Sequence, residues 1–287
     1  MKTELVIVSY NRSEILADTL ESIRRLYPDL RICLGLQGAD AEALARRFEH
    51  AFGLRTVCLE SPSVTESLNR AILSSSAEVV LMLDDDAVPC PGWLDAHIAA
   101  FEADTALAYT SGREIRVHKG RSVPSELLRM AVETLLRLVV PRGAVLQGRI
   151  VGWLTPFGVL LGNLDRPGSC VINAPRGCNM ALRTSVFRDM GGFSTAFRGN
   201  AWGFEPEFGA RLARQGRLGR YVGEAVVLHS EAASGGTRQQ KGRAWFEDFL
   251  HNHKVLMATV GRQAWLGALP RLAMRWLGTR RSASRTG

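Results

Sequence analysis

The sequence lacks the features that mark several large classes of protein. Its 287 residues contain no uninterrupted apolar run of about 18 or more, so no membrane-spanning helix is expected. The first residues lack the apolar core and cleavage pattern of a secretory signal. No segment repeats at the spacing of about 20–50 residues that is typical of solenoids. These absences predict a cytoplasmic protein that could rest on the inner face of the cell membrane.

Cysteine is scarce and scattered, which argues against a disulfide framework and against a structural zinc site. The five cysteines are odd in number, and none of them forms a CxxC pair or shows zinc-ligand spacing. We therefore expect reduced, mostly buried thiols at Cys33, Cys58, Cys90, Cys170 and Cys178.

Composition and charge describe an ordinary globular protein with a basic surplus. With 46% hydrophobic and 22% charged residues, the chain has ample material for a core, and its length suits one enlarged α/β domain. The net charge of +8 fits nucleic acid, an anionic membrane or a phosphorylated substrate. Much of the surplus lies in residues 241–287, where arginines alternate with Trp and Leu. No nucleic-acid recognition motif is present, so a packed surface helix and a peripheral membrane contact stay open for this segment.

The first 110 residues alternate between strand and helix patterns, which is typical of a doubly wound nucleotide-binding half. Strands are expected at 5–9, 31–36, 55–59 and 79–83, with helices after 13 and at 41–52 and 65–74. Beyond them the spacing favours helices at 125–140, 184–190, 202–215, 243–260 and 263–277, and strands at 170–173 and 221–229. Residues 143–167 show no clear period.

Three aspartates in a row follow the apolar strand 79–83, at the end where open α/β sheets bind ligands. Carboxylates packed this closely repel one another, and a divalent cation such as Mn²⁺ or Mg²⁺ would offset the repulsion. Asp86 is the first candidate for a metal ligand, and Asp84 faces the metal or the donor. A solvated acidic turn is the alternative.

Four ordered blocks between residues 3 and 230 resemble the family 2 glycosyltransferases of the GT-A fold. They are Val6 to Arg12, Leu83 to Asp86, Arg176 to Arg183 with Gly191 to Phe193, and Trp202 to Leu212. The resemblance implies a Rossmann-like, mostly parallel sheet with flanking helices and additional C-terminal helices. It divides the chain into a catalytic domain over 1–240, with a donor half at 1–110 and an acceptor half at 111–240, and the C-terminal segment 241–287.

The resemblance also implies a nucleoside-diphosphate sugar as donor and a glycan or lipid-linked glycan as acceptor. The side chains expected around the donor are Ser9, Tyr10, Asn11, Arg12, Gln37, Asp40, Asn69, Arg70, Asp84 and Asp85. Those expected around the acceptor are Gly177, Cys178, Asn179 and Trp202. The family usually has an aspartate after its second strand for the nucleobase, and here Gln37 or Asp40 would replace it. His229, at the end of an apolar run, would complete the metal shell.

The base motif of the family departs from its usual form in this chain. The family commonly has Glu-Asp, with a further acid two residues later, but here the register reads Phe204, Glu205, Pro206, Glu207. An inverting transfer needs one carboxylate to take the proton of the attacking hydroxyl. Glu205 is the first candidate for this base and Glu207 the competing one, and a pair of helix-start acids without catalysis is the alternative.

Sequence alone thus predicts a metal-dependent inverting glycosyltransferase, in the setting of bacterial polysaccharide or glycolipid assembly that the resemblance implies. A nucleotidyltransferase is a second hypothesis, although a glycine-rich basic phosphate loop is lacking near the start of the chain. A sugar-binding relative without catalysis is the third, and Phe204 in the base motif is the feature that favours it.

Overall fold

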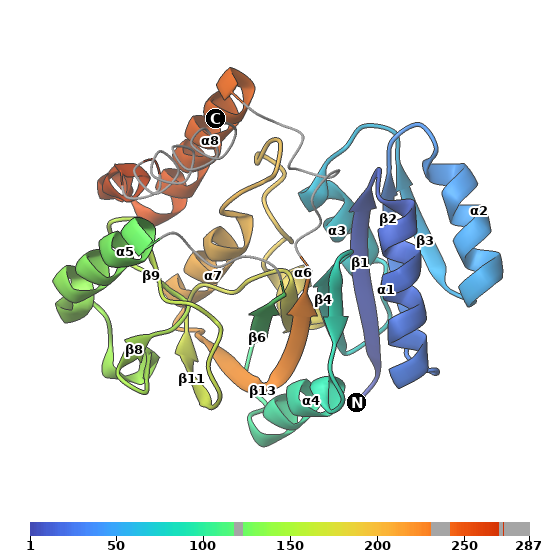
Figure 1. The fold of residues 1–287 in the computed structure, drawn as a ribbon, viewed down its shortest axis with the longest axis horizontal. Helices are drawn as coiled ribbons and strands as arrows, with labels where there is room; N and C mark the ends of the chain where they lie inside the picture. Colours follow the sequence, from blue (N-terminus) through green and yellow to red (C-terminus); the bar gives the residue numbers. More distant parts are fainter. Residues whose placement is uncertain (118–122, 231–241, 270–271, 273–287) are drawn as a thin grey trace.

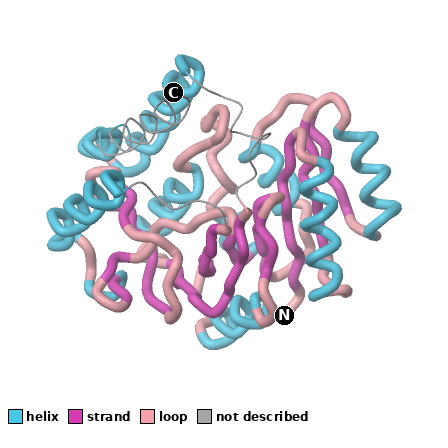
Figure 2. Tube along the Cα trace, in the orientation of Figure 1, coloured by secondary structure: helices cyan, strands magenta, loops and turns pink. Residues whose placement is uncertain are grey.

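A central sheet with helices on both faces organises the molecule. The computed structural model describes residues 1–117, 123–230, 242–269 and 272 (Figure 1). Within these residues nine strands form the main sheet, in the order β11-β13-β6-β12-β4-β1-β2-β3, and β5 pairs with β13 at its end. Figure 2 shows the strands as one layer with helices around it. The expected mixed α/β class, with a mostly parallel sheet and flanking helices, is confirmed.

The helices and strands have the following bounds. The strands of the main sheet are β1 Thr3–Tyr10, β2 Ile32–Gln37, β3 Arg55–Leu59, β4 Val79–Asp84, β5 Ala87–Pro89, β6 Tyr109–Arg116, β11 Ser169–Ile172, β12 Asn179–Arg183 and β13 Gly219–His229. The helices are α1 Ser13–Leu26, α2 Ala41–Phe52, α3 Val64–Leu73, α4 Trp93–Ala103, α5 Val123–Leu136, α6 Thr184–Asp189, α7 Phe204–Arg214 and α8 Gly242–Val260. Short pieces are β7 Val145–Leu146, β8 Arg149–Ile150, β9 Trp153–Leu154, β10 Leu160–Leu161 and the 3₁₀ turns η1 Arg137–Val139, η2 Arg142–Ala144 and η4 Arg262–Gly267.

The first four long strands run parallel, and their apolar residues divide between two cores. Successive side chains of a strand point to opposite faces of the sheet. In β1, Leu5 and Ile7 therefore join the core that contains α1, α2 and α4. Val6 joins the core on the other face, with α3, α6 and α7. Burial on both faces explains why these strands are continuous apolar runs rather than alternating ones.

The second half of the chain adds strands to the same sheet and thereby places the site. Strand β12 lies antiparallel to β4, with Asn179 opposite Leu83. Strand β13 runs parallel to β6 and ends at His229, which lies opposite Ala87 of β5. The residue before β12 and the last residue of β13 thus arrive beside the aspartates that follow β4.

Most of the expected elements are present, and the exceptions have physical reasons. The strand β3 and the helix α2 have the expected bounds. The elements α4, β6 and β12 were not predicted; the buried positions of β6 include Thr110 and Ser111, so it has no apolar alternation to read. Where a helix over 263–277 was expected, a 3₁₀ helix covers Arg262–Gly267. Residues 270–271 and 273–277 of that prediction lie outside the described residues.

Two further sequence predictions concern domain division and the membrane. The expected division at residue 110 falls inside β6, which begins at Tyr109, and both halves contribute strands to one sheet. The division stays a prediction. Among the helices of the described ranges, none is long and apolar enough to cross a membrane.

A buried ion pair joins β1 to β3 at the amino ends of these strands, away from the aspartates. Glu4 is 1% exposed, and its carboxylate accepts hydrogen bonds from Arg55 Nη2 at 2.9 Å and Arg55 Nε at 3.3 Å. Burial raises the pKa of Glu4, but hydrogen bonds from Arg55 and Ser75 and the charge of Arg31 outweigh it and lower the pKa overall. The pair therefore stabilises the fold when Glu4 is ionised.

We predict that Glu4→Gln lowers the free energy of unfolding by about 2 kcal/mol at neutral pH, because a guanidinium loses its buried counter-charge. Since the folded-state pKa lies below the unfolded one, the contribution is present above the unfolded pKa and disappears as pH falls through the folded pKa. Urea unfolding of both proteins from neutral to acid pH measures this. Glu66→Gln is the control; it removes the exposed pair with Arg70 and should cost under about 0.5 kcal/mol. Equal losses for both variants would contradict the prediction.

Candidate active site

A cleft opens at the carboxyl ends of β1, β2 and β4, where parallel sheets present their ligand sites. Its walls include the loop after β1, the start of α3 and the start of α7. The residues lining it are Val8, Tyr10, Arg12, Gln37, Val64, Leu68, Met82, Leu83, Asp84, Asp85, Gly177, Asn200, Phe204 and Glu205. Residues from all four sequence blocks thus meet in one cleft.

The three consecutive aspartates have three different environments. Asp85 points back into the protein, where Ser9 Oγ donates to it at 2.6 Å and Arg12 Nη1 at 2.8 Å. Its backbone carbonyl also accepts a hydrogen bond from the hydroxyl of Thr19 at 2.8 Å. Asp85 therefore fixes the loop after β4 against the loop after β1, so that its neighbours are held at the cleft.

Asp84 is the aspartate that faces the cleft. Half of its side-chain surface is exposed to the cleft opening, while protein walls surround the rest. Burial of the carboxylate against protein is the largest cause and raises the pKa of Asp84. The charge of His229 lowers this pKa, and the negative charges of Asp86, Asp85 and Glu205 raise it further. The pKa of Asp84 reaches about 7, so at neutral pH this carboxylate is ready to gain a cation or a proton.

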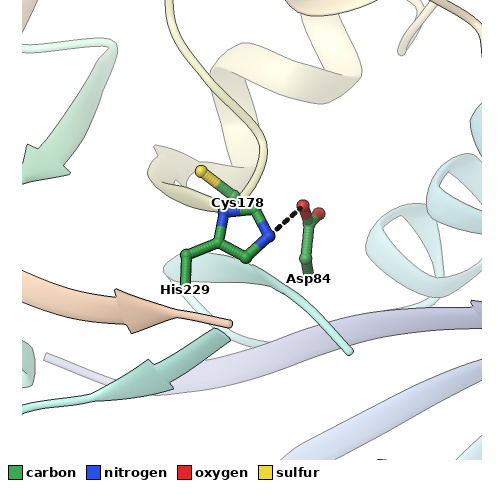
Figure 3. A group of neighbouring side chains, drawn as sticks. All are labelled: Asp84, Cys178 and His229. Carbon is green, nitrogen blue, oxygen red and sulfur yellow. Dashed lines mark ion pairs between the residues drawn. The ribbon is translucent and has the colours of Figure 1, made fainter. Parts of the chain in front are cut away.

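His229 lies between the acidic triplet and a further carboxylate, that of Glu114. Its Nε2 lies 2.9 Å from Asp86 Oδ1, and its Nδ1 lies 2.7 Å from Glu114 Oε1. The same Nε2 lies 3.7 Å from Asp84 Oδ2, the ion pair drawn in Figure 3. Burial lowers the pKa of His229, but the carboxylates of Asp86 and Glu114 and the contact with Cys178 outweigh it and raise the pKa to about 12. A positive charge is therefore favoured at this position among the acids.

Glu114 is a site residue that the sequence did not reveal. It is 5% exposed and accepts hydrogen bonds from Arg116 Nε at 2.9 Å and from Arg176 Nη1. Burial raises the pKa of Glu114, but the hydrogen bond with His229 and the charges of both arginines outweigh it and hold the pKa well below its usual range. Because β6 lacks an apolar pattern, no signal in the sequence would have singled out this glutamate.

Cys178 lies beside His229 and Asp84, and one ligand atom of each lies within 4.8 Å of the other two. Figure 3 shows the thiol next to the imidazole. Burial raises the pKa of this thiol to about 12, so it stays protonated at neutral pH. Only the thiolate is a good metal ligand, and hard cations prefer oxygen. Asp84 and His229 are thus the members of this group suited to a cation.

The two glutamates of α7 have different surroundings. Glu205 lines the cleft and accepts a hydrogen bond from the backbone N–H of Gly177 at 3.0 Å. Glu207 is 3% exposed; Arg211 Nε donates to it at 2.9 Å and Thr259 Oγ1 at 2.7 Å. Glu205 therefore faces the cleft, whereas Glu207 joins α7 to the end of α8.

The remaining residues predicted for the donor fall into two groups. Tyr10 and Gln37 line the cleft, and the Oε1 atom of Gln37 accepts a hydrogen bond from Ser63 N at 2.6 Å. Asn11, with a φ of 55°, is an exposed turn residue beside them. Asp40 is exposed at the start of α2.

Asn69 and Arg70, on α3, do not meet in the cleft. Asn69 is buried, and its side-chain amide exchanges hydrogen bonds of 2.8 Å with the backbone N–H and carbonyl of Phe193. Arg70 is exposed and pairs with Glu66. The structure thus gives both residues contacts outside the cleft.

The predicted acceptor residues are likewise divided between the cleft and the core. Gly177 lines the cleft. Asn179 is 1% exposed; its carbonyl accepts from Trp93 Nε1 at 2.8 Å, and its amide donates to Ala225 O at 2.7 Å. Trp202 packs against Phe249 of α8, with ring centroids 5.4 Å apart. Asn179 therefore fixes the strands behind the cleft, and Trp202 fixes α8 to the loop before α7.

Known proteins resemble this chain in sequence and in fold. The model of the glycosyl transferase family 2 matches residues 4–152. Chondroitin synthase of Escherichia coli is 25% identical over 242 residues, which cover 79% of this chain and 34% of that protein. The chain therefore spans about a third of the length of this relative.

Solved structures share the fold at low sequence identity. GalNAc-T7 with UDP, GalNAc and Mn²⁺ has a TM-score of 0.63 at 14% identity, over 89% of this chain and 48% of that chain. TarS 1–349 of S. aureus in complex with UDP-GlcNAc has a TM-score of 0.56 at 13% identity, over 93% and 69%. The mannosyltransferase PcManGT of Pyrobaculum calidifontis with GDP-Man and Mn²⁺ has a TM-score of 0.52 at 15% identity, over 100% and 81%.

The family match begins in β1 and continues past the acidic triplet, so it includes the strands that build one wall of the cleft. It covers just over half of the 287 residues. The fold of the solved structures agrees with it over most of the chain. This chain therefore belongs to the glycosyl transferase family 2 and has the GT-A fold.

Proposed function

We propose that this protein transfers a sugar from a nucleoside-diphosphate sugar to an acceptor hydroxyl with inversion at the anomeric carbon, and that it needs Mn²⁺ or Mg²⁺. The observation that carries the proposal is the meeting of Asp84 and Glu205 in one cleft. A cation site and a carboxylate base in one cleft are the two components that such a transfer needs.

The residues at the end of β4 fit a divalent cation. Asp84 offers a carboxylate to the cleft, and His229 offers Nε2 while its Nδ1 is held by Glu114. A carboxylate that accepts the second ring N–H orients a metal-bound histidine and makes it a better ligand. To bind a cation, His229 would release the Nε2 proton that now faces Asp86, and Asp86 would then be available to the cation or to its water.

We assign the cation to Asp84 and His229, with Asp86 beside them. When bound there, a divalent cation neutralises the charge that develops on a departing diphosphate. Support comes from the structural neighbours, since GalNAc-T7 and PcManGT were solved with Mn²⁺ and a nucleotide or nucleotide sugar. Other residues of this chain hold the metal ligands in position. Arg12 and Ser9 hold Asp85 in place, so that Asp84 stays directed into the cleft.

Glu205 is the residue we assign as the general base, and Glu207 is the competing assignment. Glu205 stands in the first turn of α7, where the helix dipole favours its ionised form. The N–H of Gly177 holds one carboxylate oxygen at 3.0 Å, which restricts how the carboxylate can turn. The base would take the proton of the acceptor hydroxyl as that hydroxyl attacks the face of the sugar opposite the leaving group.

We propose that the nucleoside part of the donor lies along the loops after β1 and β2. Tyr10 and Gln37 line this part of the cleft, and the Oε1 atom of Gln37 is already occupied by Ser63 N–H. Its Nε2 group is then the free half of the amide, which suits a carbonyl oxygen of a base. Ser9, Asn11 and Arg12 at the end of β1 and Asp40 after β2 stay proposed for the donor in this region. A donor role for Asn69 and Arg70 stays a prediction, and their contacts with Phe193 and Glu66 do not support it.

The acceptor is proposed to be a glycan or a lipid-linked glycan, in bacterial polysaccharide or glycolipid assembly at the inner face of the cell membrane. Chondroitin synthase, a relative at 25% identity, supports a polysaccharide setting. We place the acceptor along Gly177 and Cys178, with Asn179 and Trp202 fixing the elements around them. The anomeric configuration of the product, determined by NMR, tests the inversion; retention of the donor configuration would contradict it.

We predict that Asp84→Asn weakens Mn²⁺ binding by about 10- to 100-fold or more, because the cation loses its charged ligand in the cleft. Calorimetric titration of Mn²⁺ in the presence of UDP measures the affinity. Asp95→Asn, on α4 and remote from the cleft, is the matched control and should bind Mn²⁺ like the wild type. Unchanged affinity in Asp84→Asn would remove this residue from the metal site.

We predict that Glu205→Gln lowers kcat by about 10²- to 10⁴-fold while the unfolding temperature is retained, because the amide cannot take a proton. Glu207→Gln should show the reverse. Its buried contacts with Arg211 and Thr259 weaken, so stability falls by about 1–3 kcal/mol while the folded fraction keeps most of its kcat. Steady-state rates and thermal melts of both variants decide between the two glutamates. Loss of kcat in Glu207→Gln alone would transfer the role of base to Glu207.

We further predict a pH effect on the metal-free protein. The folded-state pKa of Asp84 is raised to about 7, so the folded state holds this proton more tightly than the unfolded state does. Ionisation of Asp84 therefore removes stability as pH rises from its unfolded pKa toward 7. Asp84→Asn should gain stability over the wild type across this interval, measured by urea unfolding in chelator. A constant difference between the two proteins across this pH range would contradict the assigned pKa direction.

A further inference from the structure

Helix α5 and the turn η1 that follows it expose a continuous apolar stripe. Leu127, Leu135 and Leu138 are 61%, 78% and 97% exposed, and Met130 and Val139 are exposed beside them. Their spacing of three, five, three and one residues keeps them near one side of the helical segment, because residues three, four, seven and eight apart share a helix face. Single exposed leucines are ordinary, but a stripe of this length indicates a contact surface.

The stripe is not the side by which α5 attaches to the protein. Val132 and Leu136, on the other side of the helix, pack against a satellite core that contains Val140, Ile150 and Trp153. The helix is therefore anchored by one apolar face while it presents a second one outward. A helix that is apolar on two faces usually has a second partner for the outer one.

The exposed charges at the η1 end of the stripe are positive. Arg137 and Arg142 are exposed at its end. Glu133, the only acid in the sequence between 127 and 150, is 6% exposed and lies beside Arg149. An apolar stripe bordered by exposed guanidinium groups complements a surface that is apolar within and anionic at its rim.

A second group of exposed apolar side chains lies among the last described residues, in a segment that is also basic. Trp265, Leu266 and Leu269 are exposed in and after η4. From residue 249 to the end of the chain the sequence holds seven Lys or Arg and no Asp or Glu. The helices that carry or precede the two groups both pack on β9. Trp153 of β9 lies in the core beneath α5, and Leu154 of β9 packs against Leu256 of α8. In Figure 1, α5 and α8 lie at the end of the molecule opposite α2.

We infer that α5 and η1 dock on an anionic lipid bilayer, lying in its interface with Leu135 and Leu138 inserted and Arg137 and Arg142 at the headgroups. A helix of 14 residues is too short to span a bilayer but suits its surface. A second copy of this chain is a poorer occupant, because two surfaces with the same positive rim would repel each other. The inference is independent of the metal and the base, so it can fail while the proposed transfer reaction holds.

Sedimentation with lipid vesicles tests the inference. Wild-type chain should bind vesicles of phosphatidylcholine with phosphatidylglycerol and bind vesicles of phosphatidylcholine alone much more weakly. The double variant Leu135→Ser with Leu138→Ser should lose at least about tenfold in partition to the anionic vesicles, because two inserted side chains are lost. Arg137→Gln with Arg142→Gln should lose binding mainly at low salt, where screening is weak.

The matched control replaces two exposed leucines on other elements, Leu26→Ser with Leu73→Ser, and should bind vesicles like the wild type. Thermal melts check that each variant is folded, which we expect because the substituted side chains are exposed. Full vesicle binding by the Leu135 and Leu138 variant would overturn the inference and assign binding to the basic tail. A wild-type dimer that this variant converts to a monomer, without vesicle binding by either, would overturn it in favour of self-association.

Discussion

The repulsion among the acidic groups at the end of β4 is the constraint on which the rest of the site depends. Asp84, Asp85 and Asp86 are consecutive, and Glu205 and Glu114 lie close to them. Each acid except Asp84 has a cationic partner or a hydrogen-bond donor from the protein at 3.0 Å or closer, whereas His229 Nε2 lies 3.7 Å from Asp84. Asp85 is held by Arg12, Asp86 by His229, and Glu114 by Arg176. The least compensated negative charge is thus on Asp84, the side chain that faces the cleft.

The topology of the sheet is what brings these partners together. Arg12 follows β1, the neighbour of β4, while His229 ends β13 and Glu114 lies on β6, its parallel partner. Strand β12 lies between β4 and β6, and the residues just before it place Gly177 at the cleft and Cys178 beside His229. Residues more than 140 positions apart, such as Asp86 and His229, therefore form a direct contact at 2.9 Å. The second half of the chain is needed to complete the site as well as to shape it.

The sequence predicted what depends on local pattern and missed what depends on polar contacts between strands. Continuous apolar runs identified β1, β2, β3 and β4, and the aspartates after β4 stood out because they directly follow such a run. Strand β6 has polar buried positions and gave no signal, so Glu114 was not found. Asn69 and Asn179 looked like ligand residues by type, yet their amides are used by backbone and side-chain partners within the fold. Polarity in a sequence motif does not distinguish a ligand contact from a buried structural hydrogen bond.

The departure in the base motif has a structural explanation. Phe204 is 6% exposed, and its ring meets Phe193 at a centroid distance of 4.9 Å within an aromatic cluster that also holds Phe208 and Phe187. A carboxylate at position 204 would lose its hydration among these rings and gain no partner, so an aromatic side chain is favoured there. The cluster in turn fixes the first turn of α7. The residue that follows, Glu205, is thereby directed to the cleft, so the change at Phe204 strengthens the support of the proposed base.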